Sequence, residues 1–115
     1  MTTPVNQTFY WKRHDTAPVI QCILEDSTGA AVDLTGATVK FIMAVTVGGT
    51  ALGGSATIVG TPTNGTVQYQ PTSTDTAAAG SYLAEWEVTF PSTHKETFPD
   101  PGYLTVIITA DVDNA

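Results

Sequence analysis

The sequence is short of cysteine and of basic residues, and each shortage excludes a class of structure or partner. Cys22 is the single cysteine of the 115 residues, so an internal disulfide is excluded and the fold must be held by packing alone. It stands in the apolar run PVIQCILED, where a buried structural thiol is expected rather than a nucleophile. Four Lys and Arg residues against eleven Asp and Glu residues give a net charge of −7, which argues against nucleic acid as a partner.

Long apolar runs are missing as well. No segment approaches the roughly 20 apolar residues of a membrane-spanning helix, and the start, MTTPVNQTFYWKRHD, has no apolar stretch long enough for a signal peptide. We therefore expect no membrane partner and no leader. Charged residues make up 13% of the chain while Thr, Ala, Gly and Val are plentiful, and this balance favours strands and turns over helices.

Residues for catalysis or metal binding are few and badly spaced. Asp15 follows His14, but neighbouring residues on a strand point to opposite faces, so the two are poorly placed as a base and its orienting group. The other histidine, His94, lies in a polar turn. The spacings Cys-x-x-Cys and His-x-x-x-His do not occur, which excludes a structural zinc site. We expect no catalytic residue, no metal and no cofactor.

What the chain does contain is a series of short alternating runs of apolar and polar residues, separated by turn signals. This pattern predicts one all-β domain over residues 1–115, with an ordered core at about residues 8–110. An immunoglobulin-like sandwich of two sheets is the expected architecture, and a small barrel is the alternative. The expected strands, about seven and antiparallel, lie near residues 8–14, 19–25, 38–45, 55–59, 66–70, 81–90 and 103–109.

The run at residues 81–90 indicates which of its faces meets the core. Trp86 alternates with Glu85 and Glu87, and burying two carboxylates would be prohibitive. Trp86 is therefore predicted to lie inside and the two glutamates on a solvated outer face.

A short helical turn is expected just before this strand. The segment TDTAAAG, residues 74–80, can form one turn with Thr74 or Asp75 as its cap. Tyr82 follows, and in immunoglobulin-like sandwiches a tyrosine at this place often bonds back to the corner. A plain core tyrosine is the alternative.

Two stretches rich in glycine or proline interrupt the strands. The segment TVGGTALGGS, residues 46–55, is predicted to be the most mobile loop, because glycine costs extra backbone entropy when it is ordered. In PDPG, residues 99–102, proline cannot donate a ladder hydrogen bond. Pro99 and Pro101 should therefore mark a bulge or a change of partner strand, with Gly102 absorbing the bend.

Three consecutive aromatic residues, Phe9, Tyr10 and Trp11, form the candidate interface. On a strand Phe9 and Trp11 share one face and Tyr10 takes the other, so whichever side misses the core exposes an aromatic ring. Exposed aromatic side chains are enriched at protein interfaces, although edge-strand packing would explain the same residues. Unpaired sheet edges, to which a neighbour can add a strand, are a second candidate contact surface.

Three blocks carry a resemblance to a known family: VDLTGATVKFIM (32–43), AAGSYLAEWEVTF (78–90) and ETFPDPGYLTVII (96–108). In this order and spacing they resemble the immunoglobulin-like amino-terminal domain of tailed-phage upper baseplate proteins, over about residues 8–110. The resemblance implies a non-enzymatic virion protein that docks by protein–protein contacts at the tail tip, baseplate, neck or capsid surface.

The resemblance also implies the partners and the place of assembly. Other virion proteins are the expected partners, in a homo-oligomeric or symmetric arrangement within a particle assembled in the host cytoplasm. Longer members of the family carry further regions after this domain, whereas the sequence stops at residue 115, so a stand-alone copy is expected.

Two other functions remain open at this stage. A carbohydrate- or host-surface-binding module would stack sugars on exposed Trp11, Tyr10 or Tyr69. A small hydrolase or metal-dependent enzyme would need His14, Asp15 and His94 to come together.

Overall fold

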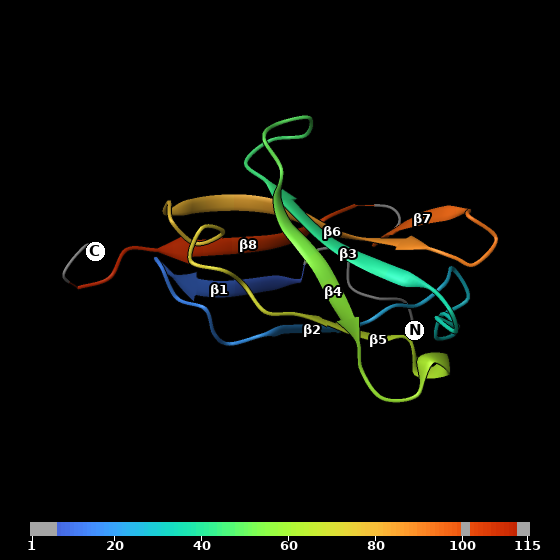
Figure 1. Cartoon of the computed structure of the whole chain (residues 1–115). Helices are drawn as coiled ribbons and strands as arrows, with labels where there is room; N and C mark the ends of the chain where they lie inside the picture. Colours follow the sequence, from blue (N-terminus) through green and yellow to red (C-terminus); the bar gives the residue numbers. More distant parts are fainter. Residues whose placement is uncertain (1–6, 100–101, 113–115) are drawn as a thin grey trace.

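A computed structural model describes residues 7–99 and 102–112, and these form an all-β domain (Figure 1). Its elements are β1 (Thr8–Lys12), β2 (Ile20–Ile23), β3 (Thr38–Ala44), β4 (Leu52–Ile58), the 3-10 turn η1 (Pro62–Asn64), β5 (Thr66–Tyr69), β6 (Gly80–Thr89), β7 (Lys95–Phe98) and β8 (Leu104–Thr109). The strand beyond the seven expected is β7, a short partner of β6.

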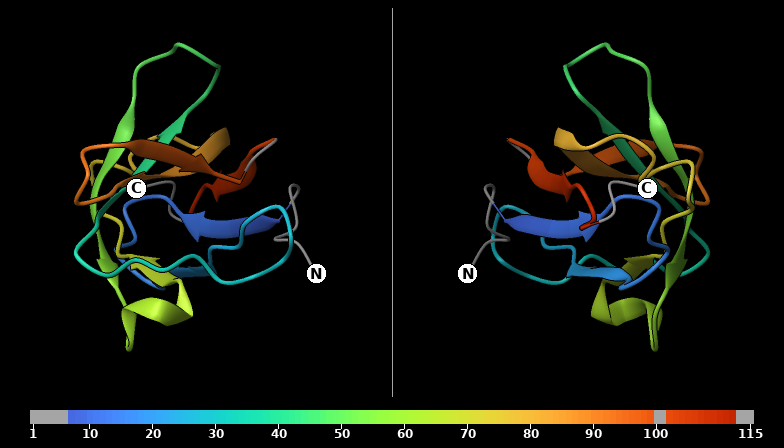
Figure 2. Two further views of the ribbon diagram at one scale, coloured as in Figure 1. Left: turned by 90° about the vertical axis from the view of Figure 1, so that its right-hand side faces the viewer. Right: turned by 90° about the vertical axis from the view of Figure 1, so that its left-hand side faces the viewer.

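The strands form two layers that share β4. The hydrogen-bonded order is β1-β8-β6-β3-β4-β5-β2, and Figure 2 shows β2 and β5 lying beneath β6 and β8. Most of β4 pairs with β3, but its last two residues, Thr57 and Ile58, pair with β5. A strand that passes from one sheet to the other makes the corner of a sandwich. We call β1, β8, β6, β7 and β3 the first layer, and β2 and β5 the second layer.

The expectation of purely antiparallel strands is wrong at one edge. β1 pairs with β8 in parallel, with Tyr10 opposite Ile107. Parallel partners need a crossover connection rather than a tight hairpin. Here β1 and β8 are the first and the last of the described strands, so the rest of the domain serves as that connection.

The core is centred on an aromatic cluster that joins the two layers. Phe41 of β3 stacks on Tyr69 of β5 at a ring-centroid distance of 4.9 Å, and Trp86 of β6 meets Phe41 edge-on at 5.0 Å. Trp86 is 1% exposed, which confirms that it faces inward. Edge-to-face and offset ring pairs add to the stabilisation from buried area.

The thiol of Cys22 is buried in this core, as expected. Burial raises the pKa of Cys22 to about 11, and the nearby indole N–H of Trp86 limits the rise. This N–H lacks the geometry of a hydrogen bond to the thiol, and no other group in the described part of the chain accepts from it.

The predicted tyrosine corner is present. The hydroxyl of Tyr82 donates a hydrogen bond to the carbonyl oxygen of Ala78 at 2.6 Å, and the Tyr82 ring is buried. The preceding segment forms a hydrogen-bonded turn, in which Thr76 N–H donates to the Thr72 carbonyl at 3.3 Å, but it is too short to be a helix. The one helical element described is instead η1, between β4 and β5.

The cap of this turn is Thr72, not Thr74 or Asp75 as expected. The Thr72 hydroxyl accepts the N–H of Asp75 at 3.2 Å, and the Asp75 carboxylate accepts the N–H of Thr72 at 2.9 Å. This reciprocal arrangement resembles a capping box. Asp75 thus occupies the third position after the cap, and its two carboxylate oxygens accept from further donors as well.

Asp75 also fastens the turn to both layers. Its carboxylate accepts the N–H of Gly53 in β4 at 3.0 Å and the hydroxyl of Tyr69 in β5. The side chain is only 4% exposed, so three donors satisfy a buried carboxylate. We call Asp75, Thr72, Tyr69 and Gly53 the buried carboxylate site.

Part of the expected glycine loop is a strand. Gly53 and Gly54 lie in β4, and the β3–β4 loop covers residues 45–51. Gly53 has a φ of 108°, and a Cβ at this position would lie 2.1 Å from the carbonyl oxygen of Phe41. Glycine is therefore required here for a close backbone approach within a sheet, not for loop mobility.

The PDPG segment separates β7 from β8, and both of these strands pair with β6. Phe98 of β7 pairs with Trp86, and Leu104 of β8 pairs with Ala84, so the chain advances from residue 98 to 104 while β6 moves from 86 to 84. Both strands pair with β6, so the partner strand does not change, and the predicted switch of partner does not occur. Gly102 takes a φ of 97°, as a bend there requires, while Pro101 lies outside the described residues.

Candidate interaction surface

The three aromatic residues proposed from the sequence separate between core and surface. Trp11 is 2% exposed, and its indole N–H donates to the carbonyl of Pro18 at 2.7 Å, so the structure moves it from the candidate interface to the core. Phe9 is partly buried and packs against the core on the same side. Tyr10 faces outward with 66% of its surface exposed. Of the three, Tyr10 is the one available to a partner.

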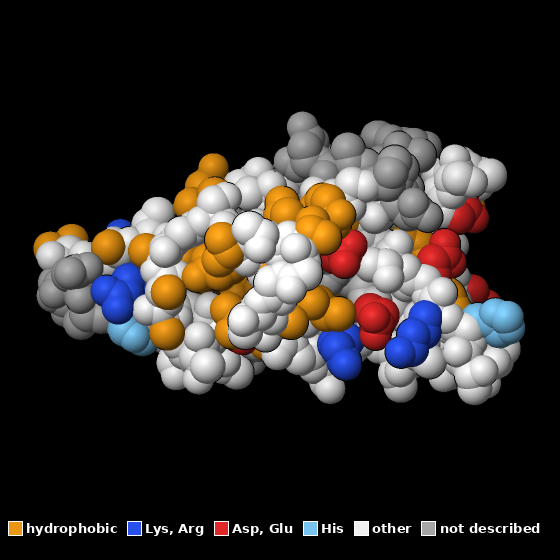
Figure 3. Space-filling view, turned by 90° about the horizontal axis from the view of Figure 1, so that it is seen from above, with side chains coloured by type: hydrophobic (Ala, Val, Ile, Leu, Met, Phe, Trp, Pro, Cys, Tyr) orange, Lys and Arg blue, Asp and Glu red, His pale blue; other side chains and the backbone are white. Residues whose placement is uncertain are grey.

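Tyr10 belongs to the outer face of the first layer, which divides into two halves. One half carries apolar side chains at positions where a solvated sheet would carry polar ones. We call this set the apolar half: Tyr10, Ile42, Ala44, Leu83, Tyr103 and Ile107. Figure 3 shows hydrophobic side chains gathered over the middle of the face seen from above.

The other half of this face is polar and internally paired. Lys40 lies opposite Glu87 in the β3–β6 ladder, and Lys95 of β7 approaches the Glu87 carboxylate at 3.9 Å. We call Thr38, Lys40, Glu87, Thr89 and Lys95 the polar half. Most of the acidic side chains visible in Figure 3 stand to the right of the hydrophobic ones.

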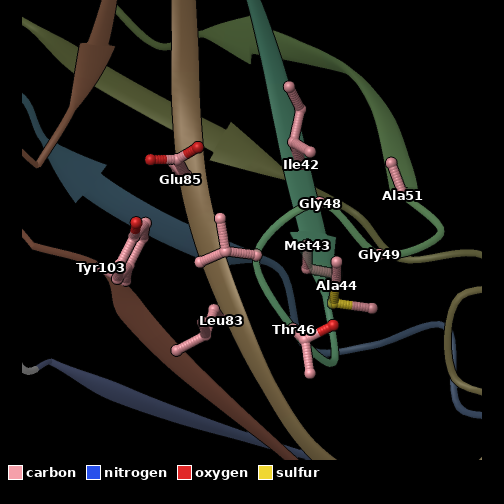
Figure 4. A pocket seen from close by; sticks show the side chains of 11 residues that line it. Ile42, Met43, Ala44, Thr46, Gly48, Gly49, Ala51, Leu83, Glu85 and Tyr103 are labelled. Carbon is pink, nitrogen blue, oxygen red and sulfur yellow. The ribbon is translucent and has the colours of Figure 1, made fainter.

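A pocket opens in the apolar half beneath the β3–β4 loop (Figure 4). It encloses about 160 Å³. Its walls come from β3, β6, the loop and the residue before β8, and its lining includes Ile42, Ala44, Val47, Leu83, Glu85 and Tyr103. Val45 and Val47 project from the loop with 63% and 72% of their surfaces exposed. An exposed apolar surface with a polar rim is typical of a protein contact site.

Glu85 is the acidic group of the pocket. Partial burial, followed by the charge of nearby Glu87, raises the pKa of Glu85 above its usual value. The structure shows no hydrogen bond or ion pair to the Glu85 carboxylate from any residue it describes, whereas Glu87 has Lys95. The sequence placed both glutamates on a solvated face, and the structure shows that Glu85 is partly desolvated.

The residues proposed for catalysis do not come together. His14 lies beyond the end of β1, where its N–H bonds to the carbonyl of Thr76, next to the start of β6. His94 lies in the turn that follows the other end of β6. A ten-residue strand spans roughly 33 Å, so the two imidazoles stand at opposite ends of the domain.

The described residues form neither a candidate metal site nor a membrane-spanning helix. Residues 7–99 and 102–112 contain no group of three His, Cys, Asp or Glu side chains that could hold a metal ion. The same residues form no helix long and apolar enough to cross a membrane.

Sequence reasoning missed the apolar half although its signal was present. Leu83 and Ile42 occupy outward positions of strands whose inward positions are already apolar. A strand with apolar residues on both faces indicates that both faces are covered.

The comparisons with known proteins give a family and a fold. A model of the BppU N-terminal domain matches residues 8–98. The N-terminal domain of phage TP901-1 ORF48 superposes with a TM-score of 0.68 at 14% identity, over 92% of this chain and 89% of that chain. CopC from Methylosinus trichosporium OB3b gives a TM-score of 0.48 at 12% identity, over 93% of this chain and 90% of that chain, which is too low to support an argument. No curated protein matches the chain.

Proposed function

The chain belongs to the family of baseplate upper protein (BppU) N-terminal domains, and we propose that it is a non-enzymatic virion component that docks on neighbouring proteins. Family membership gives it a structural role in a bacteriophage particle. Beyond this role, we propose that the protein docks at the tail tip, baseplate, neck or capsid surface.

The apolar half carries this proposal. A face with Leu83, Ile42 and Tyr10 at outward positions leaves apolar surface in water unless another protein covers it. Expected partners are other virion proteins, in a homo-oligomeric or symmetric arrangement within a particle that assembles in the host cytoplasm. Four basic residues against eleven acidic ones give little with which to neutralise the phosphates of a nucleic acid.

The carbohydrate-binding alternative retains one of its three aromatic residues. Tyr69 is 5% exposed and its ring stacks on Phe41, so neither it nor Trp11 presents a face to a sugar. Tyr10 remains exposed, but a single ring on an apolar sheet face favours a protein partner over a glycan.

The direct test is to look for the chain in purified particles. Quantitative mass spectrometry of gradient-purified virions, from the phage that encodes the chain, should find it at a constant ratio to the major capsid protein. A chain found in the infected cell but missing from washed particles would contradict the proposal.

A further inference from the structure

We propose that the pocket beneath the β3–β4 loop receives an apolar side chain of a partner protein, with an adjacent Lys or Arg of that partner pairing with Glu85. The inference rests on the proposed docking function and adds the chemistry of the partner. It makes the pocket the specific part of a wider contact over the apolar half.

The pocket has the size and lining for one large apolar side chain. Its volume of about 160 Å³ is near the ~150 Å³ that accommodates a benzene-sized group in a protein interior. Leu83 of β6, Ile42 of β3 and Tyr103 line it (Figure 4), and Val47 of the β3–β4 loop belongs to the same lining. The glycines of the loop, Gly48 and Gly49, line the pocket without adding side chains that would fill it.

Glu85 sets the charge of the ligand. Its carboxylate is partly desolvated and has no described partner, and an apolar group seated beside it would remove more water. Burying a carboxylate without a counter-charge is unfavourable, so an occupant without a cation would bind poorly. A partner that brings a guanidinium or ammonium group to Glu85 removes this cost and gains specificity.

A second copy of this chain fits the pocket less well than a basic partner. Two copies would each bring a net charge of −7 to the contact. Of the few bases, Lys95 already approaches Glu87 and Lys40 lies opposite the same glutamate. Like charge across an interface opposes association, so charge complementarity favours a partner with a basic surface.

A peptide titration followed by NMR tests the chemistry. The probes are acetyl-Leu-Arg-amide and acetyl-Leu-Glu-amide, added to the 15N-labelled full chain up to about 20 mM, because a fragment of this size binds weakly. We expect saturable shifts at the amides of Leu83, Glu85 and Gly49, and at least about tenfold weaker binding of the Glu peptide. Glu85→Gln should remove this preference, and the control Glu87→Gln should keep it.

The particle provides the second test. Phage genomes carrying Glu85→Lys or Val47→Asp should yield virions that contain at least about tenfold less of this chain, measured where its sites in the particle are not saturated. Glu85→Gln should cause a smaller loss. The controls are Glu87→Gln on the polar half and Ile23→Asp on β2, both of which should be incorporated like wild type. Melting temperatures of the purified variants separate lost docking from lost folding.

Each outcome bears on one of the two proposals. Wild-type chain missing from particles overturns the proposed function. Wild-type, Glu85→Lys and Val47→Asp chains incorporated equally leave the docking function standing and overturn the pocket as its site. Three results would overturn the proposal that the pocket receives a partner with a basic group. These are equal binding of the two peptides, shifts confined to other faces, and a stable dimer of the wild-type chain with this pocket in its interface.

Discussion

Two carboxylates of this domain, Asp75 and Glu85, are surrounded in opposite ways. Asp75 is 4% exposed and accepts hydrogen bonds from the N–H groups of Thr72 and Gly53 and from the Tyr69 hydroxyl. Glu85 is only partly buried and has no such donor in the structure as described. A buried carboxylate with all its partners stabilises the fold, whereas a half-desolvated one without partners is available to a second molecule.

The two faces of β6 differ in burial in the same way as the two carboxylates. Its inward residues are at most 4% exposed: Tyr82, Ala84, Trp86 and Val88. Its outward residues Leu83, Glu85 and Glu87 are half-buried. Substitutions around Asp75 should therefore change the stability of the domain, and substitutions around Glu85 should change what it binds.

The largest effect is expected for Asp75→Ala. It leaves the Tyr69 hydroxyl and the N–H groups of Gly53 and Thr72 without their acceptor, so the free energy of unfolding should fall by about 3–5 kcal/mol. Urea denaturation followed by tryptophan fluorescence measures the loss. A loss below about 1 kcal/mol would mean that water replaces the carboxylate without cost.

Gly53→Ala should come next, with a loss of about 3 kcal/mol. The new Cβ would lie 2.1 Å from the Phe41 carbonyl oxygen at a φ of 108°, and relieving that contact would displace the N–H that bonds to Asp75. Gly54→Ala is the matched control, because its Cβ meets nothing closer than the Tyr69 hydroxyl at 3.8 Å. Equal unfolding free energies for the two variants would contradict the close approach seen at Gly53.

Tyr69→Phe should cost about 1–2 kcal/mol at neutral pH, because it removes one donor and leaves Asp75 with two. Burial, and then the hydrogen bond to Asp75, raise the pKa of Tyr69. A folded-state pKa above the unfolded value means that this contribution is complete below about pH 10 and is lost as the pH rises further. Unfolding free energies from pH 9 to 12 should therefore fall less steeply in Tyr69→Phe than in its parent.

The parent for this comparison should carry Cys22→Ala. Burial raises the pKa of Cys22 to about 11, so the thiol adds its own loss of stability, which starts near pH 9. Parallel slopes for Tyr69→Phe and its parent in this background would show that Tyr69 ionises as freely in the fold as outside it.

The smallest effect on stability, and of opposite sign, is expected for Glu85→Gln. Burial and Glu87 raise the pKa of Glu85, so the ionised group is slightly unfavourable in the folded chain at pH 7. Removing its charge should raise the unfolding free energy by no more than about 0.5 kcal/mol, given solvent screening. The melting temperature at pH 7 checks this, and a clear destabilisation would show that Glu85 has a structural partner after all.

The sequence predicted well those features that alternation and local turns determine. In residues 81–90 the glutamates exclude one face from the core, so the inward direction of Trp86 followed without knowledge of any partner strand. The bond from Tyr82 to its corner was expected from immunoglobulin-like sandwiches, with a plain core tyrosine as the alternative, and it is a local bond to a residue four positions earlier, Ala78.

Features that depend on distant partners were beyond reach. Alternation in residues 8–12 puts Trp11 and Tyr10 on opposite faces but does not say which face is buried, and the carbonyl that accepts from Trp11 belongs to a turn at Pro18. The parallel pairing of β1 with β8 joins the two ends of the chain, and no local pattern encodes it. Gly53 was taken for a loop residue, since a glycine required by a neighbouring strand looks the same in sequence.

A cryo-electron microscopy map of the intact phage particle tests the central claim most directly. The domain should be found with the outer face of its first layer covered by another virion protein, and with an apolar side chain and a Lys or Arg of that protein at Leu83 and Glu85. A particle in which this face looks onto solvent, while the second layer makes the contacts, would contradict the account.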